Sequence, residues 1–304
     1  MGVLKPGWWF RAGLRGMDAT AGGLSLQFAG WKVRLLLAIA SAKNWPILAI
    51  DVQTAFLNGK LLETLSCRQP PGFETFDLTT GESQVMRLKR ALYGLRQSPN
   101  VWNVTMGTEL RKMSFLTTPS DPYVYTKGSH EGYVMLTLYV ADVLMTGPSI
   151  SILQQVQDAL KSRFFISELG PVSLILGIEV IRDEARGSLM LSQHRCVKPM
   201  LKKFGMESSD PVHTPGTPHQ PVDDASEDTF LESSEKTNYQ AMVGSLIFLA
   251  HKTIFDIAFS VPQVARHMSS PSSQHLVAVE RIFRSLKRKP NLPLTYLTSN
   301  KNLD

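Results

Sequence analysis

The stretch "YVMLTLYVADVLMTG", residues 133–147, decides the fold of this chain. It contains two apolar runs, 133–140 and 143–145, which meet at Ala141 and Asp142. Short apolar runs rich in Val, Leu and Tyr on either side of a polar break predict a β-hairpin. The hairpin carries one carboxylate at its turn. It is therefore either a metal-binding hairpin with a single Asp or an ordinary buried pair of strands.

Helical and extended patterns alternate around this hairpin. The stretch "ILAIDVQTAFLNG" predicts a short apolar strand that enters a polar turn at Asn58 and Gly59. Ser98 and Pro99 form a favourable N-cap and N1 pair, so a helix is expected to begin there. Other patterns predict a helix at 31–43, an amphipathic helix at 150–165, a second hairpin at 174–193 with its turn at 183–187, and two or three helices after residue 236. This order indicates an α+β fold with a largely antiparallel sheet backed by helices, which is compatible with a polymerase palm and with many other folds.

The composition changes along the chain and indicates four segments. Residues 1–30 are rich in Gly and Trp and have no sustained period, so they are expected to be poorly ordered. Residues 31–206 hold the alternating helices and strands, and Pro199 is expected to interrupt a short helix near the end of this segment. Pro, Ser, Asp and Glu dominate residues 207–236, which predicts a linker. Residues 237–304 are expected to be helical and contain a basic cluster.

The overall composition is that of a globular protein. Of the 304 residues, 43% are apolar and 19% are charged, and the formal net charge of +6 is compatible with polyanionic partners without being diagnostic of them. The two cysteines, Cys67 and Cys196, lack metal-ligand spacing and are too few for a disulfide framework, so an intracellular, cytoplasmic location is expected. The apolar stretch 33–42 is too short to span a bilayer and lies too deep for a signal peptide, so no membrane partner is expected.

Asp51 and Asp142 are the residues that could carry chemistry. Nucleotidyl transfer needs two divalent ions about 3.5–4 Å apart, held by carboxylates. Magnesium prefers octahedral oxygen ligands, so two or three Asp side chains from adjacent strand ends suffice. The expected signature is an Asp at the end of one apolar strand and an Asp pair at the turn of a later hairpin. Asp51, after "WPILAI", supplies the first element, and Asp142 supplies half of the second.

Six blocks of sequence stand in order between about Trp31 and Pro290. They are "VRLLLAIASAKNWPILAIDVQTAFLNGKLLETLSCRQPPGFE", "RLKRALYGLRQSPNVW", "LYVADVLMTG", "LILGIEV", "LSQHRCVKPMLKKFGM" and "YQAMVGSLIFLAHKTIFDIAFSV". In order and spacing they resemble the reverse transcriptase of copia-type retrotransposon polyproteins. The resemblance implies a palm with partial fingers and a primer-gripping hairpin over 31–206, then a thumb-like or connection-like segment over 237–304 that ends before a ribonuclease H domain.

The resemblance also implies a role for each residue that matches a family motif. Asp51 matches the metal-binding Asp of the first palm motif. Phe56 matches the aromatic residue beneath the incoming sugar, with a plain core aromatic as the alternative. Tyr93 and Gly94 match the motif that lines the nucleotide and template pocket, and Tyr139 belongs to the same predicted nucleotide site.

Two further features point to nucleic acid, one from the resemblance and one from the charge of a predicted helix. Leu176 and Gly177 resemble the primer-gripping turn. The basic cluster is expected to contact phosphates, and a solvated helix end is an equal alternative. This cluster comprises Arg281, Arg284, Lys287, Arg288 and Lys289. The implied cofactor is Mg²⁺ or Mn²⁺, and the implied partners are an RNA template, a DNA primer and deoxynucleoside triphosphates.

The chain departs from the family at the centre of the site. The family has Tyr-Val-Asp-Asp where this chain has Tyr139, Val140, Ala141 and Asp142, so a methyl group replaces a direct metal ligand. Neighbouring side chains in a hairpin point to opposite faces, so Asp142 is not expected to fill the vacancy at Ala141. In addition, residues 1–30 show no match to the family's basic fingers segment.

Two hypotheses share this ancestry. The first is a catalytically impaired remnant of a retrotransposon polymerase, which could still bind nucleic acid without catalysis. The second is an active reverse transcriptase in which Asp51 and Asp142 hold the metal. The sequence favours the remnant, because loss of one direct electrostatic contribution costs roughly 10²–10³ in rate.

Overall fold

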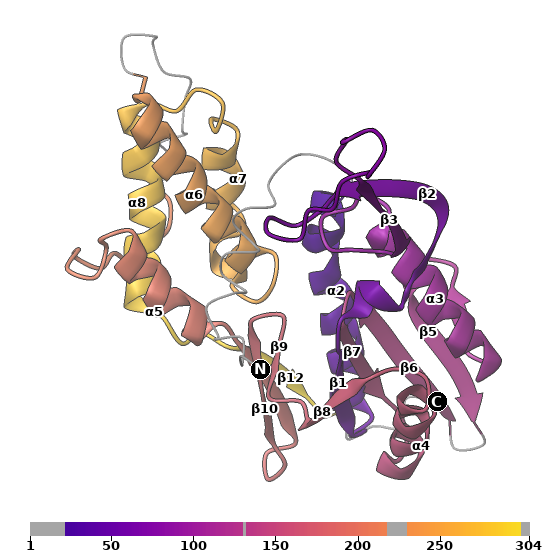
Figure 1. Ribbon diagram of the computed structural model, residues 1–304. Coiled ribbons are helices and arrows are strands. Elements are labelled where there is room, and N and C mark those ends of the chain that lie inside the picture. Colours follow the sequence, from indigo (N-terminus) through magenta and orange to yellow (C-terminus); the bar gives the residue numbers. More distant parts are fainter. Residues whose placement is uncertain (1–21, 130–131, 218–229, 299–304) are drawn as a thin grey trace. The chain divides into compact units, whose positions relative to one another are not determined.

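Figure 1 shows the computed structural model, which describes residues 22–129, 132–217 and 230–298. The chain divides into two compact units. One unit is Pro46–Pro171, and the other combines Met1–Trp45 with Val172–Asp304. The second hairpin and the helix after it belong to the same unit as the C-terminal helices. Each unit is described separately below.

The unit Pro46–Pro171 is built on a six-stranded sheet with the order β4-β5-β6-β7-β1-β8. Every strand pairing among the described residues is antiparallel, which confirms the predicted α+β class with an antiparallel sheet. The strands are β1 Ile47–Val52, β4 Leu116–Thr118, β5 Asp121–Ser129, β6 Gly132–Tyr139, β7 Asp142–Thr146 and β8 Ile166–Pro171.

Two helices, α3 (Ser98–Lys112) and α4 (Ile150–Lys161), cover one face of this sheet (Figure 1). Helix α3 begins one residue earlier than the predicted Ser98–Pro99 pair implies: Gln97 is the N-cap, and the Ser98 hydroxyl donates to the Leu92 carbonyl instead of capping the helix. Pro99 still lies in the first turn, where its missing N–H would have no helical partner. The Ser149 hydroxyl caps α4 by accepting from the Ile152 N–H. Apolar side chains of both helices and of alternate strand positions form one buried cluster: Trp102, Met106, Leu110, Leu153, Val156, Leu160, Ile50, Leu136, Leu138, Val143 and Met145.

The turn of the β6–β7 hairpin lies one residue earlier than predicted. Tyr139 pairs with Asp142, so the two turn residues are Val140 and Ala141 rather than Ala141 and Asp142. Val140 has a φ of 51°, a conformation that β-branched residues rarely adopt. The prediction followed the preference of Val for strands and of Asp for turns. In the structure Asp142 is already a strand residue, because it pairs with both neighbouring strands.

A two-stranded sheet extends from the same unit. It contains β2 (Lys60–Arg68) and β3 (Val85–Arg90) and follows a short 3₁₀ helix, η1 (Ala55–Asn58). Gly59 lies between η1 and β2, where an added Cβ would come within 2.6 Å of Val101 on α3. The chain passes so close to α3 here that only glycine fits, which explains why glycine follows Asn58 at the predicted turn.

The other unit contains a four-stranded sheet and a helical cluster. The sheet has the order β12-β11-β10-β9, with strands β9 Leu174–Ile175, β10 Ile178–Asp183, β11 Ser188–Ser192 and β12 Leu294–Leu297. The predicted second hairpin is therefore confirmed, whereas β12 was not predicted. The helices are α2 Gly22–Ala42, α5 His194–Lys203, α6 Ser233–Ala250, η3 Phe255–Ile257, α7 Ser260–Ala265 and α8 Ser273–Arg288. Helices α5 to α8 share a second buried apolar cluster.

Two predicted helices in this unit differ from the structure. Helix α2 begins at Gly22 rather than Trp31, because no proline interrupts 22–42 and glycine weakens a helix without ending it. Residues 1–21 lie outside the described residues. Helix α5 runs through Pro199, which is exposed, so the backbone carbonyl that it leaves unpaired can be hydrated.

The predicted linker 207–236 also differs. Its last residues, 233–236, are the first turn of α6, and residues 209–214 are hydrogen bonded to α8. Residues 218–229 lie outside the described residues. Among the helices that the structure describes, none is long and apolar enough to cross a membrane.

Candidate active site

The two acidic residues singled out by the sequence stand opposite each other. Asp51 on β1 pairs with Asp142 on β7 in the antiparallel register. Next to them, the Val52 N–H donates to the Ala141 carbonyl at 2.9 Å, so the Asp51–Asp142 pair is of the non-hydrogen-bonded kind. Such a pair brings the two Cα atoms to about 4.5 Å and directs both side chains to the same face. The carboxylates are therefore neighbours on one face of the sheet.

Both carboxylates are partly buried, and burial has a cost for Asp51. Desolvation raises the pKa of the Asp51 carboxyl above its usual value of 3.8. The raised pKa means that burial disfavours the ionised Asp51 carboxylate, and a cation bound beside it would stabilise this ionised form. Within the described residues no third His, Cys, Asp or Glu joins the pair to form a metal-binding group.

Tyr139 lies beside Asp142 at the end of β6. Burial raises the pKa of its phenol to about 12, and the neighbouring Asp142 charge adds to the increase. Tyr139, Asp142 and Asp51 occupy consecutive paired positions on strands β6, β7 and β1, and they therefore share one face. The phenol is neutral at physiological pH and can donate a hydrogen bond there.

Phe56 and Tyr93 form an aromatic pair, and Tyr93 lies within reach of the Asp51 charge. Phe56 in η1 is buried, and its ring centroid lies 4.6 Å from that of Tyr93 at an interplanar angle of 49°. Burial raises the pKa of Tyr93, and the Asp51 charge adds to the increase, which places the phenol within electrostatic reach of the carboxylate. Gly94 follows with a φ of 98° and open space where a Cβ would stand. Its conformation, not its packing, requires glycine there.

Ala141 lies in the turn directly before Asp142. Its methyl group packs against the apolar cluster beneath the sheet. Directly beside it, the indole Nε1–H of Trp102 on α3 donates to the carbonyl of Val140. Trp102 is a site residue that sequence reasoning missed. It stood in a recognised block, but a helix pattern does not reveal a hydrogen bond to a turn 38 residues away.

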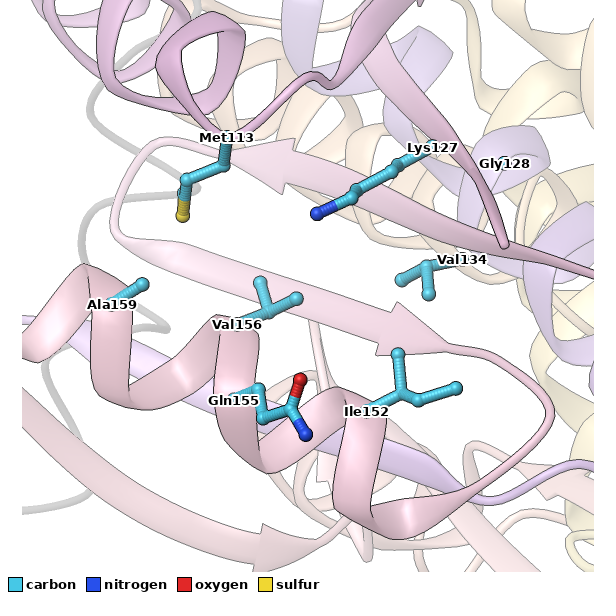
Figure 2. A pocket seen from close by; sticks show the side chains of 8 residues that line it. All are labelled: Met113, Lys127, Gly128, Val134, Ile152, Gln155, Val156 and Ala159. Carbon is cyan, nitrogen blue, oxygen red and sulfur yellow. The ribbon is translucent and has the colours of Figure 1, made fainter. Parts of the chain in front are cut away.

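A cavity of about 270 Å³ lies elsewhere in this unit (Figure 2). Its lining residues come from α4, from β5 and β6, and from the end of α3: Met113, Lys127, Gly128, Val134, Ile152, Gln155, Val156 and Ala159. Successive side chains of a strand point to opposite faces, so Val134 and Tyr139, an odd number of positions apart on β6, face opposite sides of the sheet. Tyr139 shares its face with the carboxylates, and the cavity therefore lies on the other face. It has one cationic side chain and no carboxylate, and it is not a metal site.

Comparison with known proteins decides the family. The family described as reverse transcriptase (RNA-dependent DNA polymerase) matches residues 28–218. This chain belongs to the reverse transcriptase family. It is 33% identical over 259 residues to the retrovirus-related Pol polyprotein of transposon TNT 1-94 from Nicotiana tabacum, covering 84% of this chain and 19% of the polyprotein.

Other relatives place the chain with the copia-type retrotransposons. It is 34% identical over 259 residues to the Pol polyprotein of transposon RE1 from Arabidopsis thaliana, covering 85% of this chain and 17% of the polyprotein. It is 28% identical over 252 residues to a transposon Ty5-1 protein of Saccharomyces cerevisiae, covering 83% of this chain and 80% of that protein. The chain thus spans less than a fifth of the two plant polyproteins and most of the yeast protein.

The residues that resemble the primer-gripping turn lie in the other unit. Leu176 and Gly177 join β9 to β10, with φ angles of 51° and 75°. The Lys252 ammonium donates to the Leu176 carbonyl, and the Cys196 thiol donates to the Gly177 carbonyl at 3.4 Å. An added Cβ at Gly177 would lie 3.2 Å from Phe248. The turn is therefore held by contacts from α5, from α6 and from Lys252, which follows α6.

The basic cluster on α8 is largely engaged within the chain. The Arg284 Nε and Lys287 Nζ atoms each donate at 2.6 Å, to the carbonyls of Asp210 and Ser209 respectively. Arg281 donates to the Thr214 hydroxyl at 3.1 Å. Arg288 and Lys289 are exposed at the end of the helix. The structure thus gives three of the five residues a role in fixing residues 209–214, which the sequence did not indicate.

Proposed function

We propose that this chain is a remnant of a retrotransposon RNA-directed DNA polymerase that keeps a palm-like site but has strongly impaired catalysis. The observation that carries the proposal is the register of Asp51 with Asp142, which leaves two facing carboxylates beside a turn where Ala141 stands in place of a family Asp. The family supplies the reaction class. The local geometry supplies the reason for the impairment.

The remaining carboxylates fit one divalent ion. Mg²⁺ in proteins is commonly bound by one or two carboxylates, with water and substrate phosphates as its other ligands, and two facing Asp side chains meet that need. A second ion would need the carboxylate that Ala141 lacks. When bound, a pair of ions stabilises both the attacking and the leaving oxygen in nucleotidyl transfer. Loss of one such electrostatic contribution costs about 10²–10³ in rate.

The other site residues have roles in binding. Phe56 would lie beneath the sugar of an incoming deoxynucleoside triphosphate, supported by its contact with Tyr93. The positive φ of Gly94 would let the backbone pass close to the nucleotide or template. Tyr139, which stays protonated near Asp142, would donate a hydrogen bond beside the metal. An RNA template and a DNA primer are the partners that this reading requires.

An active enzyme is the second candidate. The observation in its favour is that Asp142 stands directly opposite Asp51, although Asp142 was not expected to fill the vacancy at Ala141. Two facing carboxylates could hold one ion while the triphosphate brings the other.

Primer extension on an RNA template separates these candidates. The unmodified chain, Ala141→Asp and Asp51→Asn would be compared in Mg²⁺ and then in Mn²⁺. The remnant predicts that Ala141→Asp extends the primer at least ~10² faster than the unmodified chain, and that Asp51→Asn is inactive. Asp51-dependent synthesis by the unmodified chain at a rate equal to that of Ala141→Asp would favour the active enzyme.

A second experiment measures binding of nucleic acid in the absence of DNA synthesis. The net charge of +6 supports retained affinity for a polyanion. The expected result is binding of an RNA–DNA duplex that weakens steeply as salt increases, because phosphate contacts release counterions. Affinity that does not change with salt would contradict a retained nucleic-acid surface.

A further inference from the structure

We propose that Trp102 is a positioning residue for the carboxylate hairpin: its indole N–H fixes the Val140–Ala141 turn and thereby keeps Asp142 opposite Asp51. The hydrogen bond itself is a feature of the fold. Its consequence for the metal site rests on the proposed function. No motif of the sequence assigned a role of this kind to Trp102.

The donor is held rigidly. The Trp102 side chain is 1% exposed on the inner face of α3. Its ring meets that of Phe164 edge to face, with centroids 5.3 Å apart and an interplanar angle of 78°. A buried indole needs a partner for its N–H, and the Val140 carbonyl is that partner. Helix α3 therefore presents one fixed donor to the turn.

The turn is held from both sides. Trp102 donates to the Val140 carbonyl, and the backbone N–H of Val52 donates to the Ala141 carbonyl at 2.9 Å. Both carbonyls of the two-residue turn thus accept hydrogen bonds from outside the hairpin. Val52 follows Asp51 in β1, and Asp142 follows Ala141 in β7. The two donors therefore set the position of the turn relative to both carboxylates.

The conformation of Val140 explains why an external donor is needed. A valine with a φ of 51° is strained, and such strain persists only where the surroundings determine the conformation. Without the indole N–H, the turn is free to relax by a change in φ and ψ of Val140, which reorients the Val140 carbonyl. The Ala141–Asp142 peptide, whose carbonyl accepts from the Val52 N–H, would shift with the turn, and the direction of Asp142 would change.

Two variants distinguish this role from simple packing. Trp102→Phe keeps an aromatic ring in the cluster and removes the N–H. Tyr125→Phe is the matched control, because Tyr125 is also buried in the same cluster and loses a hydrogen bond that does not involve the Val140–Ala141 turn, the one from its hydroxyl to Asn103 Oδ1 at 3.3 Å. Both variants would be made in the full chain.

The first measurement is NMR of the backbone amides and of the indole. In the unmodified chain we expect a scalar coupling across the hydrogen bond from Trp102 ¹⁵Nε1 to the Val140 ¹³C carbonyl. In Trp102→Phe we expect the Val52 amide to exchange with solvent about tenfold faster, with no such change in Tyr125→Phe. Absence of the coupling, or equal acceleration in both variants, overturns the proposal. The coupling needs no variant, so it decides even if Trp102→Phe does not fold.

The second measurement is Mn²⁺ binding followed by electron paramagnetic resonance. Trp102→Phe is expected to bind Mn²⁺ about tenfold more weakly than the unmodified chain, and Tyr125→Phe is expected to bind equally well. Equal affinity in Trp102→Phe overturns the link to the metal site. If the unmodified chain binds no Mn²⁺, the proposed function fails, and the NMR result alone decides the role of Trp102 in the turn.

Discussion

Two hairpin turns in this protein contain a non-glycine residue with a positive φ angle, and a different kind of side chain binds the carbonyl of that residue in each. The Val140–Ala141 turn joins β6 to β7, and the Leu176–Gly177 turn joins β9 to β10. In each turn the first residue is not glycine and has a φ of 51°. In each, the carbonyl of that residue accepts a hydrogen bond from a side chain far away in the sequence.

The donors differ in charge and in surroundings. The Val140 carbonyl receives a neutral indole N–H from Trp102, which is buried in the cluster beneath the sheet. The Leu176 carbonyl receives the ammonium of Lys252, which also lies 4.2 Å from the centroid of the Phe248 ring. A hydrogen bond from a charged donor is the stronger kind. Both turns show that tertiary contacts can fix a turn whose own residues are poorly suited to it.

The charged donor gives the largest expected effect. Lys252→Met keeps most of the side-chain volume and removes the ammonium, so we expect the free energy of unfolding to fall by about 1.5–3 kcal/mol. Denaturant unfolding followed by circular dichroism measures this change. Lys203→Met is the matched control, because Lys203 lies 4.8 Å from the centroid of the Phe204 ring but is exposed, and its loss is expected to change stability by less than about 0.5 kcal/mol. Equal losses in the two variants would contradict a special role for Lys252.

Relief of strain at the first turn position gives a smaller effect of opposite sign. Val140→Gly removes a positive-φ cost of about 1–2 kcal/mol and adds a conformational entropy cost of about 0.5–1 kcal/mol. The net expectation is a gain in unfolding free energy of roughly 0.5–1 kcal/mol, measured by denaturant unfolding. Ala141→Gly serves as the control, since the φ of Ala141 is not positive, and it is expected to lose stability. A loss in Val140→Gly would show that the turn does not strain Val140.

The smallest expected effect is on one ionisation. Asp142→Asn removes the charge beside Tyr139, so the pKa of Tyr139 should fall from about 12 toward 10.0. It should not reach 10.0, because burial is the larger cause of the increase and remains in the variant. The difference between the ultraviolet alkaline titrations of the variant and the unmodified chain reports this shift. An unchanged titration curve would place Asp142 away from Tyr139.

The secondary structure of the site could be read from the sequence because its signals are local. Alternation and apolar content in "ILAIDV" gave β1, and the Ser98–Pro99 pair gave the start of α3 to within one residue. Asp51 was expected at the end of a strand and lies there. Its pairing with Asp142 could not be predicted, because register depends on the contacts of both strands.

Side-chain contacts between residues far apart in the chain could not be predicted from the sequence. Arg284 and Lys287 looked like phosphate ligands, since a basic helix end gives no sign of the carbonyls of Asp210 and Ser209 that it binds. Trp102 looked like one more apolar helix residue. Its N–H matters only because the fold brings the Val140 carbonyl to it. Such pairs are formed by the tertiary structure and leave no periodic signal.

The central claim is that the facing pair Asp51 and Asp142 holds one divalent ion and lacks the ligand for a second. The most direct test is the stoichiometry of Mn²⁺ binding, titrated by electron paramagnetic resonance in the unmodified chain, Asp51→Asn and Ala141→Asp. We expect one ion in the unmodified chain, none in Asp51→Asn, and two in Ala141→Asp when a deoxynucleoside triphosphate is present. Two ions in the unmodified chain under the same conditions, or binding that survives Asp51→Asn, would contradict this account.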